Sequence, residues 1–167
     1  MPAPARTTSN GDGRVHHLNC GTLCPPAVKL ALGHAHMVCH CLLIETAQHG
    51  LVLVDTGLGT NDVANPRRLG RASSAMLGPR LELGECAIEH VRTLGFERDD
   101  VRHIVVTHLH LDHAGGLNDF PRAQVHVHLG ECYAAMRGPT SAERAGYITA
   151  QIEHSPRWQT YRDAGDR

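Results

Sequence analysis

Four potential metal ligands lie within six residues near the middle of the chain, and this cluster constrains fold and chemistry more than any other feature. Residues 107–116 have the sequence Thr-His-Leu-His-Leu-Asp-His-Ala-Gly-Gly, and the four side chains are His108, His110, Asp112 and His113. Because side chains alternate along an extended chain, the first three would point to one side and the last elsewhere. A loop that turns here can divide the four groups into pairs around two metal ions. Imidazole nitrogen and carboxylate oxygen suit Zn²⁺, Fe²⁺ or Mn²⁺.

The residues on either side of this cluster favour a rigid metal site over a surface loop that merely contains histidines. The apolar pattern of residues 101–107 predicts a strand that is buried on both faces towards its end. Such a strand holds the side chains that follow it in place. Gly115 and Gly116 allow the backbone to turn closely beside the cluster. Together these features favour ligand roles for the four residues.

The segment resembles the His-x-His-x-Asp-His hallmark of the metallo-β-lactamase superfamily. Residues 51–57, Leu-Val-Leu-Val-Asp-Thr-Gly, are similar to that family's early strand, and residues 124–128 to the strand after its motif. The resemblance covers about residues 35–135 and implies an α/β fold, a metallo-β-lactamase-type αββα sandwich, of which this chain is the N-terminal half. The ending Asp-His-Ala-Gly-Gly is most similar to the lactonase and esterase branch, which includes acyl-homoserine lactonases.

The resemblance also implies a role for each matching residue. His108 and His110 would bind a first metal ion, and Asp112 and His113 a second, with zinc as the expected metal and iron or manganese as alternatives. Asp55 would be a structural residue beside the metal loop. Asp112 is also the candidate catalytic residue, since it could handle a proton for the leaving group. The implied activity is that of a metal-dependent hydrolase, in which a metal-bound hydroxide cleaves an ester, lactone or thioester.

The later ligands of the family are missing from this sequence. The family has a His in a Pro-Gly-His context, a bridging Asp and a final His in its second half. Here the histidine after His128 is His154, which no glycine precedes, and Asp166 does not follow an apolar strand. We therefore expect a flexible arm over residues 1–14 and a metallo-β-lactamase-like domain over residues 15–167, truncated at its C-terminus. Such a half-domain would expose a sheet edge and an apolar face.

Other functions remain open beside the hydrolase. A sulfur dioxygenase with one iron ion could share the same His-x-His-x-Asp-His core, whereas diiron oxygen reductases carry Glu where this chain has His110. A nuclease of the same fold is disfavoured, because no basic patch is present to hold phosphates. The chain could also be a catalytically inactive fragment.

Charge and hydropathy exclude further classes of partner. The 167 residues include 16 Lys plus Arg and 17 Asp plus Glu, so the chain has no global field for nucleic acid or an anionic membrane. It has no run of about 18 apolar residues that could cross a bilayer. We therefore expect a small-molecule substrate and neither nucleic acid nor membrane as partner. The oligomeric state stays undetermined.

The six cysteines are expected to be free thiols in a cytoplasmic protein, because the N-terminal residues contain no apolar signal segment. Cys39 and Cys41 alternate with His40 along a predicted strand, so these three cannot converge on a metal, and core packing is expected. Cys20 and Cys24 have the spacing of a zinc half-site, but no second cysteine pair follows.

The rest of the pattern predicts a layered α/β arrangement. Strands are expected over residues 37–45, 51–54, 101–107 and 123–128, the first two as an antiparallel hairpin, and helices over residues 85–94 and 131–136. Residues 57–80 and 137–167 are expected to be irregular, with at most one short helix in the first. His126, Tyr147 and Tyr161 are interpreted as ordinary strand or packing residues.

Overall fold

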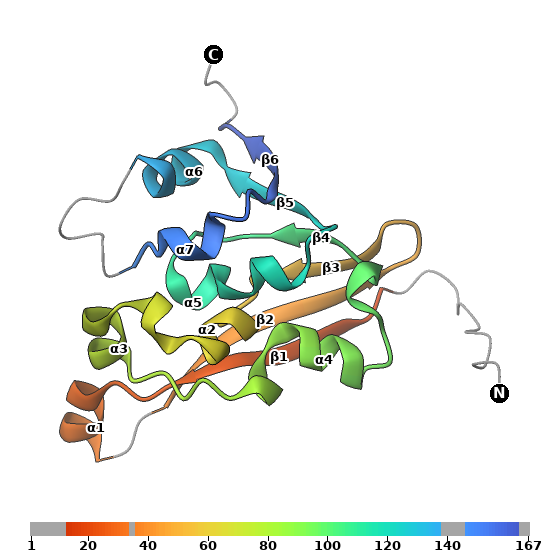
Figure 1. Ribbon diagram of the computed structural model, residues 1–167. Coiled ribbons are helices and arrows are strands. Elements are labelled where there is room, and N and C mark those ends of the chain that lie inside the picture. The colour runs from red at the N-terminus through yellow and green to blue at the C-terminus, as the bar shows by residue number, and fades with distance from the viewer. Residues whose placement is uncertain (1–12, 34–35, 138–145, 164–167) are drawn as a thin grey trace.

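The structure is a computed structural model that describes residues 13–33, 36–137 and 146–163, and its centre is a six-stranded sheet (Figure 1). The strands follow one another across the sheet in chain order: β1 (Val15–Leu23), β2 (Met37–Thr46), β3 (Gly50–Val54), β4 (Val101–Val105), β5 (Gln124–His128) and β6 (Arg157–Tyr161). The first three are antiparallel neighbours, whereas β3 to β6 run parallel. Because parallel strands end at the same edge, the segments after β3 and β4 meet there.

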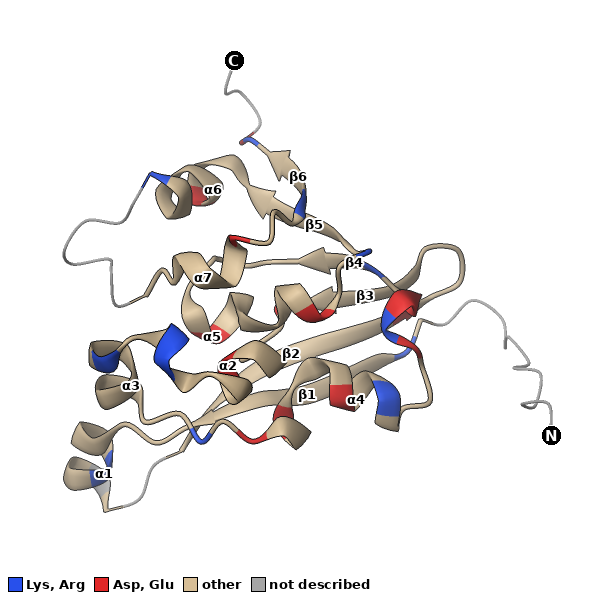
Figure 2. Ribbon diagram, viewed as in Figure 1, with Lys and Arg blue, Asp and Glu red and all other residues tan. Residues whose placement is uncertain are grey.

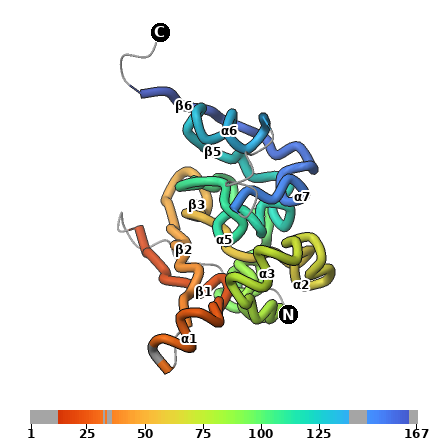
Figure 3. The backbone as a smooth tube through the Cα atoms, turned by 90° about the vertical axis from the view of Figure 1, so that its left-hand side faces the viewer, coloured from red at the N-terminus to blue at the C-terminus, as the bar shows by residue number. Residues whose placement is uncertain are grey.

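Most of the helices lie on one face of this sheet, as two perpendicular views show (Figures 1 and 3). The helices are α1 (Pro26–Leu32), α2 (Thr60–Ala64), α3 (Arg71–Leu77), α4 (Ala87–Thr93), α5 (Leu111–Ala114), α6 (Leu129–Met136) and α7 (Thr149–Ile152). Short 3₁₀ turns cover Pro66–Leu69, Leu83–Glu85, Arg98–Asp100 and Gly115–Asp119. Leu53, Ile104 and Val125 from three neighbouring strands are buried in one cluster with Val91 of α4 and Leu117. This apolar cluster joins the helical layer to the sheet.

The regular elements with a clear pattern are confirmed. The predicted hairpin is present, since β2 pairs antiparallel with β3 and places Leu43 opposite Leu53. The helix expected over residues 85–94 is α4, and the strand expected over residues 123–128 is β5. The α/β class is therefore confirmed, and the described residues provide one sheet with a helical layer.

The expectations for the irregular segments are wrong. Residues 57–80 contain both α2 and α3, and residues 137–167 contribute α7 and the strand β6. The strand β1 and the helix α1 were not expected at all. None of these helices and strands has a strong apolar period in its sequence. Pairing with a neighbouring strand orders the two strands, and contacts with neighbouring segments order the helices. Almost all of the expected arm, residues 1–14, lies outside the described residues.

β4 is buried on one face only, which corrects the expectation of burial on both. Ile104 is fully buried beneath the helices, but Val105, its neighbour, is 40% exposed on the opposite face. The charged residues lie mostly in helices and connecting segments, and β3 and β5 contain none (Figure 2). In the part of the chain that the structure describes, no helix is long and apolar enough to cross a membrane.

Candidate metal centre

The predicted ligand cluster begins just beyond the end of β4 and continues into a short helix. His108 lies in the connection, His110 stands immediately before α5, and Asp112 and His113 belong to α5 itself. Residues 108–116 were expected to be a polar loop, so α5 and the 3₁₀ turn after it correct that expectation. Side chains of successive residues in a helix point about 100° apart, so Asp112 and His113 do not alternate as they would in an extended chain.

The structure brings the three predicted histidine ligands together. The ring centroid of His108 lies 4.7 Å from that of His110 and 3.9 Å from that of His113. The Nε2 atom of His113 lies 3.4 Å from Oδ2 of Asp112. All four side chains are half-buried, so their donor atoms remain reachable from solvent.

The Asp112–His113 pair has the spacing of two ligands on one zinc ion. Two ligands of a tetrahedral Zn²⁺ with bonds of about 2.0–2.1 Å lie about 3.3–3.4 Å apart, which matches the 3.4 Å between these donor atoms. Among the described residues, no three or more His, Cys, Asp or Glu side chains form a group that could hold a metal ion. The donor types of the Asp112–His113 pair suit zinc, but the pair is by itself too small a set to hold the ion.

Asp55 orients His113 and anchors the start of the loop. Its buried carboxylate accepts hydrogen bonds from the backbone N–H of Thr107 (2.8 Å) and from the Thr107 hydroxyl (2.7 Å). Its Oδ2 atom also accepts from Nδ1 of His113 at 2.9 Å. With the proton on Nδ1, the Nε2 lone pair of His113 is free for a metal, as in many metal sites. The structure thus places Asp55 where the resemblance implied a structural residue.

Thr56 holds the other side of the same loop. Its backbone N–H and its hydroxyl both donate to the carbonyl oxygen of His113, each at 2.8 Å. The backbone N–H of Gly116 donates in turn to the Thr56 hydroxyl at 3.1 Å. The Asp-Thr turn after β3 therefore clamps α5 at both the side chain and the backbone of His113.

The local charges determine where protons reside in the metal-free centre. Burial lowers the pKa of His113, but hydrogen bonds and charge attraction from Asp112 and Asp55 outweigh burial and raise it to about 10. Burial raises the pKa of Asp112, yet contact with His113 outweighs this and the pKa is lowered overall. Burial, followed by the charges of His113 and His110, lowers the pKa of His108. A metal ion must therefore displace a proton from His113, whereas His108 offers a neutral ring.

The segment after residue 145 supports the centre in a way that sequence reasoning missed. Tyr147 was interpreted as a packing residue, but its ring meets the His110 ring edge-on at 4.8 Å. The backbone N–H of Leu111 donates to the carbonyl of Gly146 at 2.8 Å. The fully buried Gln151 donates from Nε2 to the Leu111 carbonyl at 3.1 Å. An isolated aromatic or amide in an irregular sequence gives no signal for such a contact.

Replacing Gln151 by leucine is expected to lower the free energy of unfolding by about 1–3 kcal/mol, because two acceptors each lose the hydrogen bond that the buried amide donates. These acceptors are the Leu111 carbonyl and Oδ2 of Asp62, which lies 2.9 Å from Nε2. Urea unfolding followed by circular dichroism measures the change. The same substitution at the exposed Gln48 is the control and should change stability by less than about 0.5 kcal/mol. Equal stability of the two variants would contradict a supporting role for Gln151.

The other candidate ligands named from the sequence do not join the cluster as ligands in the part of the chain that the structure describes. His154 is exposed beyond α7, and Asp166 lies outside the described residues. Cys39 and Cys41 are buried in the core while His40 is exposed, as expected for strand packing. All six cysteines are free thiols.

Comparison with known proteins connects this geometry to a family. The family model of the metallo-β-lactamase superfamily matches residues 36–163. A probable metallo-hydrolase of Mycobacterium tuberculosis is 44% identical over 144 residues, which are 86% of this chain and 44% of that protein. The N-acyl homoserine lactonase AiiA of Bacillus thuringiensis subsp. kurstaki is 33% identical over 97 residues, which are 58% of this chain and 38% of that protein.

Solved structures show the same fold. A crystal structure of a Bacillus thuringiensis AiiA variant with N-decanoyl-L-homoserine bound has a TM-score of 0.69 at 24% identity, over 89% of this chain and 59% of that one. A probable metal-dependent hydrolase from Staphylococcus aureus has a TM-score of 0.71 at 21% identity, over 91% of this chain and 60% of that one. The chain spans less than half the length of the two curated relatives described above. Its sequence and fold agree on one assignment: the chain belongs to the metallo-β-lactamase superfamily.

Proposed function

We propose that this chain carries part of the metal centre of a hydrolase that cleaves a small-molecule ester, lactone or thioester. The observation that carries the proposal is the Asp112–His113 pair, whose donor atoms lie 3.4 Å apart while Asp55 orients the imidazole. A donor pair at zinc-ligand spacing, with a carboxylate behind the histidine, supplies part of the arrangement that a catalytic metal needs.

Each residue of the motif has a proposed role. His108 and His110 would hold one zinc ion, and Asp112 and His113 a second, while iron or manganese could bind the same donors. A bound divalent ion supplies a water of lowered pKa and polarises the electrophile. Asp112 would use its other carboxylate oxygen to exchange a proton with the leaving group. Asp55 would keep the His113 ring in the tautomer that binds metal.

The substrate class rests on the relatives. A probable metallo-hydrolase and several N-acyl homoserine lactonases are similar in sequence to this chain. Their names support hydrolysis of a carbonyl ester or lactone rather than of a phosphodiester. The two donor pairs of this chain leave each ion short of ligands, since zinc takes about four. We therefore propose that further ligands come from polypeptide beyond these residues.

The decisive experiment is to titrate zinc into the purified chain by calorimetry and to assay a chromogenic ester and a lactone. We expect weak zinc binding and very low turnover, because the donor pairs are incomplete. His110→Ala should weaken zinc binding by at least about tenfold by removing a ligand. His49→Ala, which changes an exposed histidine outside the motif, is the matched control and should bind zinc as the unchanged chain does.

Three outcomes would contradict the proposal in different ways. Tight binding of two ions with robust turnover would refute the shortage of ligands. Unchanged zinc binding by His110→Ala would refute the assignment of the motif as the metal centre. Retention of iron together with oxygen uptake on a persulfide would favour the sulfur dioxygenase instead of the hydrolase.

A further inference from the structure

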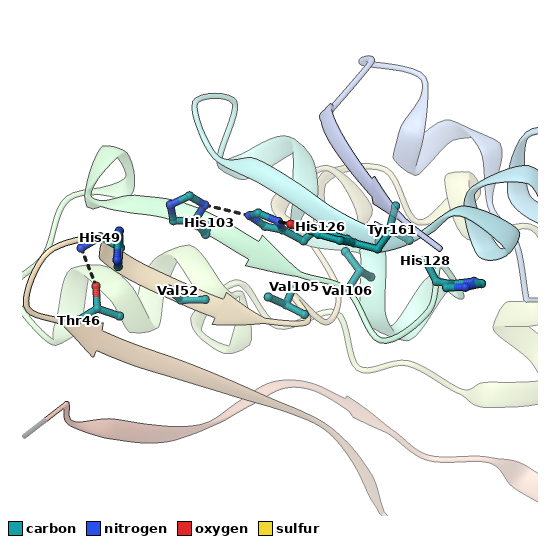
Figure 4. A pocket seen from close by; sticks show the side chains of 10 residues that line it. Thr46, His49, Val52, His103, Val105, Val106, His126, His128 and Tyr161 are labelled. Carbon is teal, nitrogen blue, oxygen red and sulfur yellow. Dashed lines mark hydrogen bonds between the residues drawn. The ribbon is translucent and has the colours of Figure 1, made fainter. Parts of the chain in front are cut away.

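The face of the sheet opposite the helices carries a second group of histidines. Side chains from the β2–β3 turn and from β3 to β6 surround an open cavity of about 550 Å³ on this face (Figure 4). Val52 and Val105 form its apolar floor, and His103, His126 and Tyr161 project beside them. The neighbouring strands are almost free of charged residues (Figure 2). Imidazole rings are therefore the main polar groups that this cavity offers to a ligand.

His103 and His126 direct ring nitrogens at each other across two parallel strands. Nδ1 of His103 on β4 lies 2.9 Å from Nε2 of His126 on β5. The second ring nitrogen of His126, Nδ1, lies 2.7 Å from the hydroxyl oxygen of Tyr161 on β6. Both histidines are half-buried, and both line the open cavity (Figure 4). Three successive strands thus each contribute one member of a continuous polar chain.

The spacing of the two nitrogens fits adjacent ligands on one metal ion. Two nitrogens bound at about 2.0–2.1 Å and at right angles to each other lie about 2.9 Å apart, so rotations of the two rings that turn their lone pairs from each other toward one ion keep this separation, and right-angled nitrogen ligands suit Cu²⁺ or Ni²⁺. We propose that His103 and His126 form a second metal site, separate from the motif, which takes Cu²⁺ or Ni²⁺ as two adjacent ligands. Solvent in the cavity supplies the remaining ligands.

Tyr161 is placed to set the tautomer that such a site requires. For Nε2 of His126 to bind an ion, its proton must lie on Nδ1, where it donates to the Tyr161 hydroxyl oxygen. An outer hydrogen bond of this kind orients a metal-binding histidine. His103 needs only to carry its proton on Nε2, so binding to the two neutral rings shifts tautomers and releases no proton. Burial and the neighbouring His103 lower the pKa of His126, which favours the neutral, ligating form.

The metal-free alternative is a simple hydrogen bond between two imidazoles, and residue-resolved binding separates the two cases. Cu²⁺ is titrated into the isotope-labelled chain while the histidine ring signals are followed by NMR, because a bound paramagnetic ion broadens the rings that hold it. We expect the signals of His103 and His126 to disappear together before one equivalent is added. His103→Gln and His126→Gln assign the signals, and each should lose this binding event. Tyr161→Phe should weaken it by about tenfold.

The controls keep this result independent of the proposed catalytic centre. His154→Gln removes an exposed imidazole that does not line this cavity and should leave binding at the pair unchanged. The rings of His108 and His110 are observed in the same spectra, so copper at the motif is seen as a separate event. If the signals of His103 and His126 persist in the unchanged chain while those of His108 and His110 broaden, the second site does not exist. This outcome is measured on the unchanged chain, so it does not depend on whether any variant folds.

Discussion

Replacing Asp55 by alanine is expected to weaken zinc binding at the Asp112–His113 pair by about 10–100-fold, because the imidazole loses the partner that orients it. The free energy of unfolding should fall by about 2–4 kcal/mol, since the N–H and hydroxyl of Thr107 lose a buried acceptor. Zinc calorimetry and urea unfolding measure the two effects. Asp163→Ala, at a highly exposed carboxylate, is the control and should change neither quantity.

The variant Asp55→Asn separates orientation from stability. Its amide oxygen can still accept from the Thr107 N–H, but its amide N–H₂ group faces Nδ1 of His113. The ring must then accept at Nδ1 and carry its proton on Nε2, which blocks the metal-binding nitrogen. In Ser-His-Asp catalytic triads, the same Asp-to-Asn change fixes the wrong histidine tautomer and greatly lowers the rate. We expect Asn to lose less stability than Ala and as much zinc affinity. Full zinc affinity in the Asn variant would show that Asp55 does not set the tautomer.

Replacing Gly59 by alanine is expected to lower the free energy of unfolding by about 3 kcal/mol, because a backbone carbonyl cannot step aside. A Cβ atom at this position would lie 2.0 Å from the carbonyl oxygen of Gly115, directly after α5. The backbone angles of Gly59, φ −99° and ψ 169°, are allowed for any residue, so the expected cost comes only from the contact between the new Cβ atom and the Gly115 carbonyl. Displacing Gly115 should also move the ligands of α5 and weaken zinc binding.

The control for this prediction is Gly84→Ala, where a Cβ would meet no atom within 4 Å. This variant should change stability by less than about 0.5 kcal/mol in the same urea series. Equal stability of the Gly59 and Gly84 variants would mean that the turn after β3 and the turn after α5 can separate freely, contrary to the packing seen here.

Much of the fold follows from local patterns, and the exceptions have identifiable causes. The hairpin of β2 and β3 was predictable because two apolar runs flank a glycine-containing turn. The helix α5 was not, because the ligands at His110, Asp112 and His113 interrupt any apolar period in that segment. The strand β6 was missed because its residues are mostly exposed and only pairing with β5 orders them.

The candidate site divides in the same way. Its four candidate donors were singled out from residue types and spacing, and the nearby Asp55 from the resemblance to the family. Gln151 and Tyr147 were not given supporting roles, because a lone amide or aromatic carries no spacing rule. Their roles exist only where α7 and the residues just before it pack against α5 and the residue before it, about 40 residues away along the chain.

By itself, the sequence indicated which potential metal donors are present, which strand precedes them, and which family the chain belongs to. The local sequence suffices for these conclusions, because the types of the donor residues and the alternation of a strand can be recognised within a few residues. Only the tertiary structure decided that the rings of His108, His110 and His113 lie together, that Asp55 and Thr56 hold His113 from the turn after β3, and that His103 meets His126 across the uncovered face. These contacts depend on long-range packing, in which segments far apart along the chain supply the hydrogen-bond partners that each other's polar groups need.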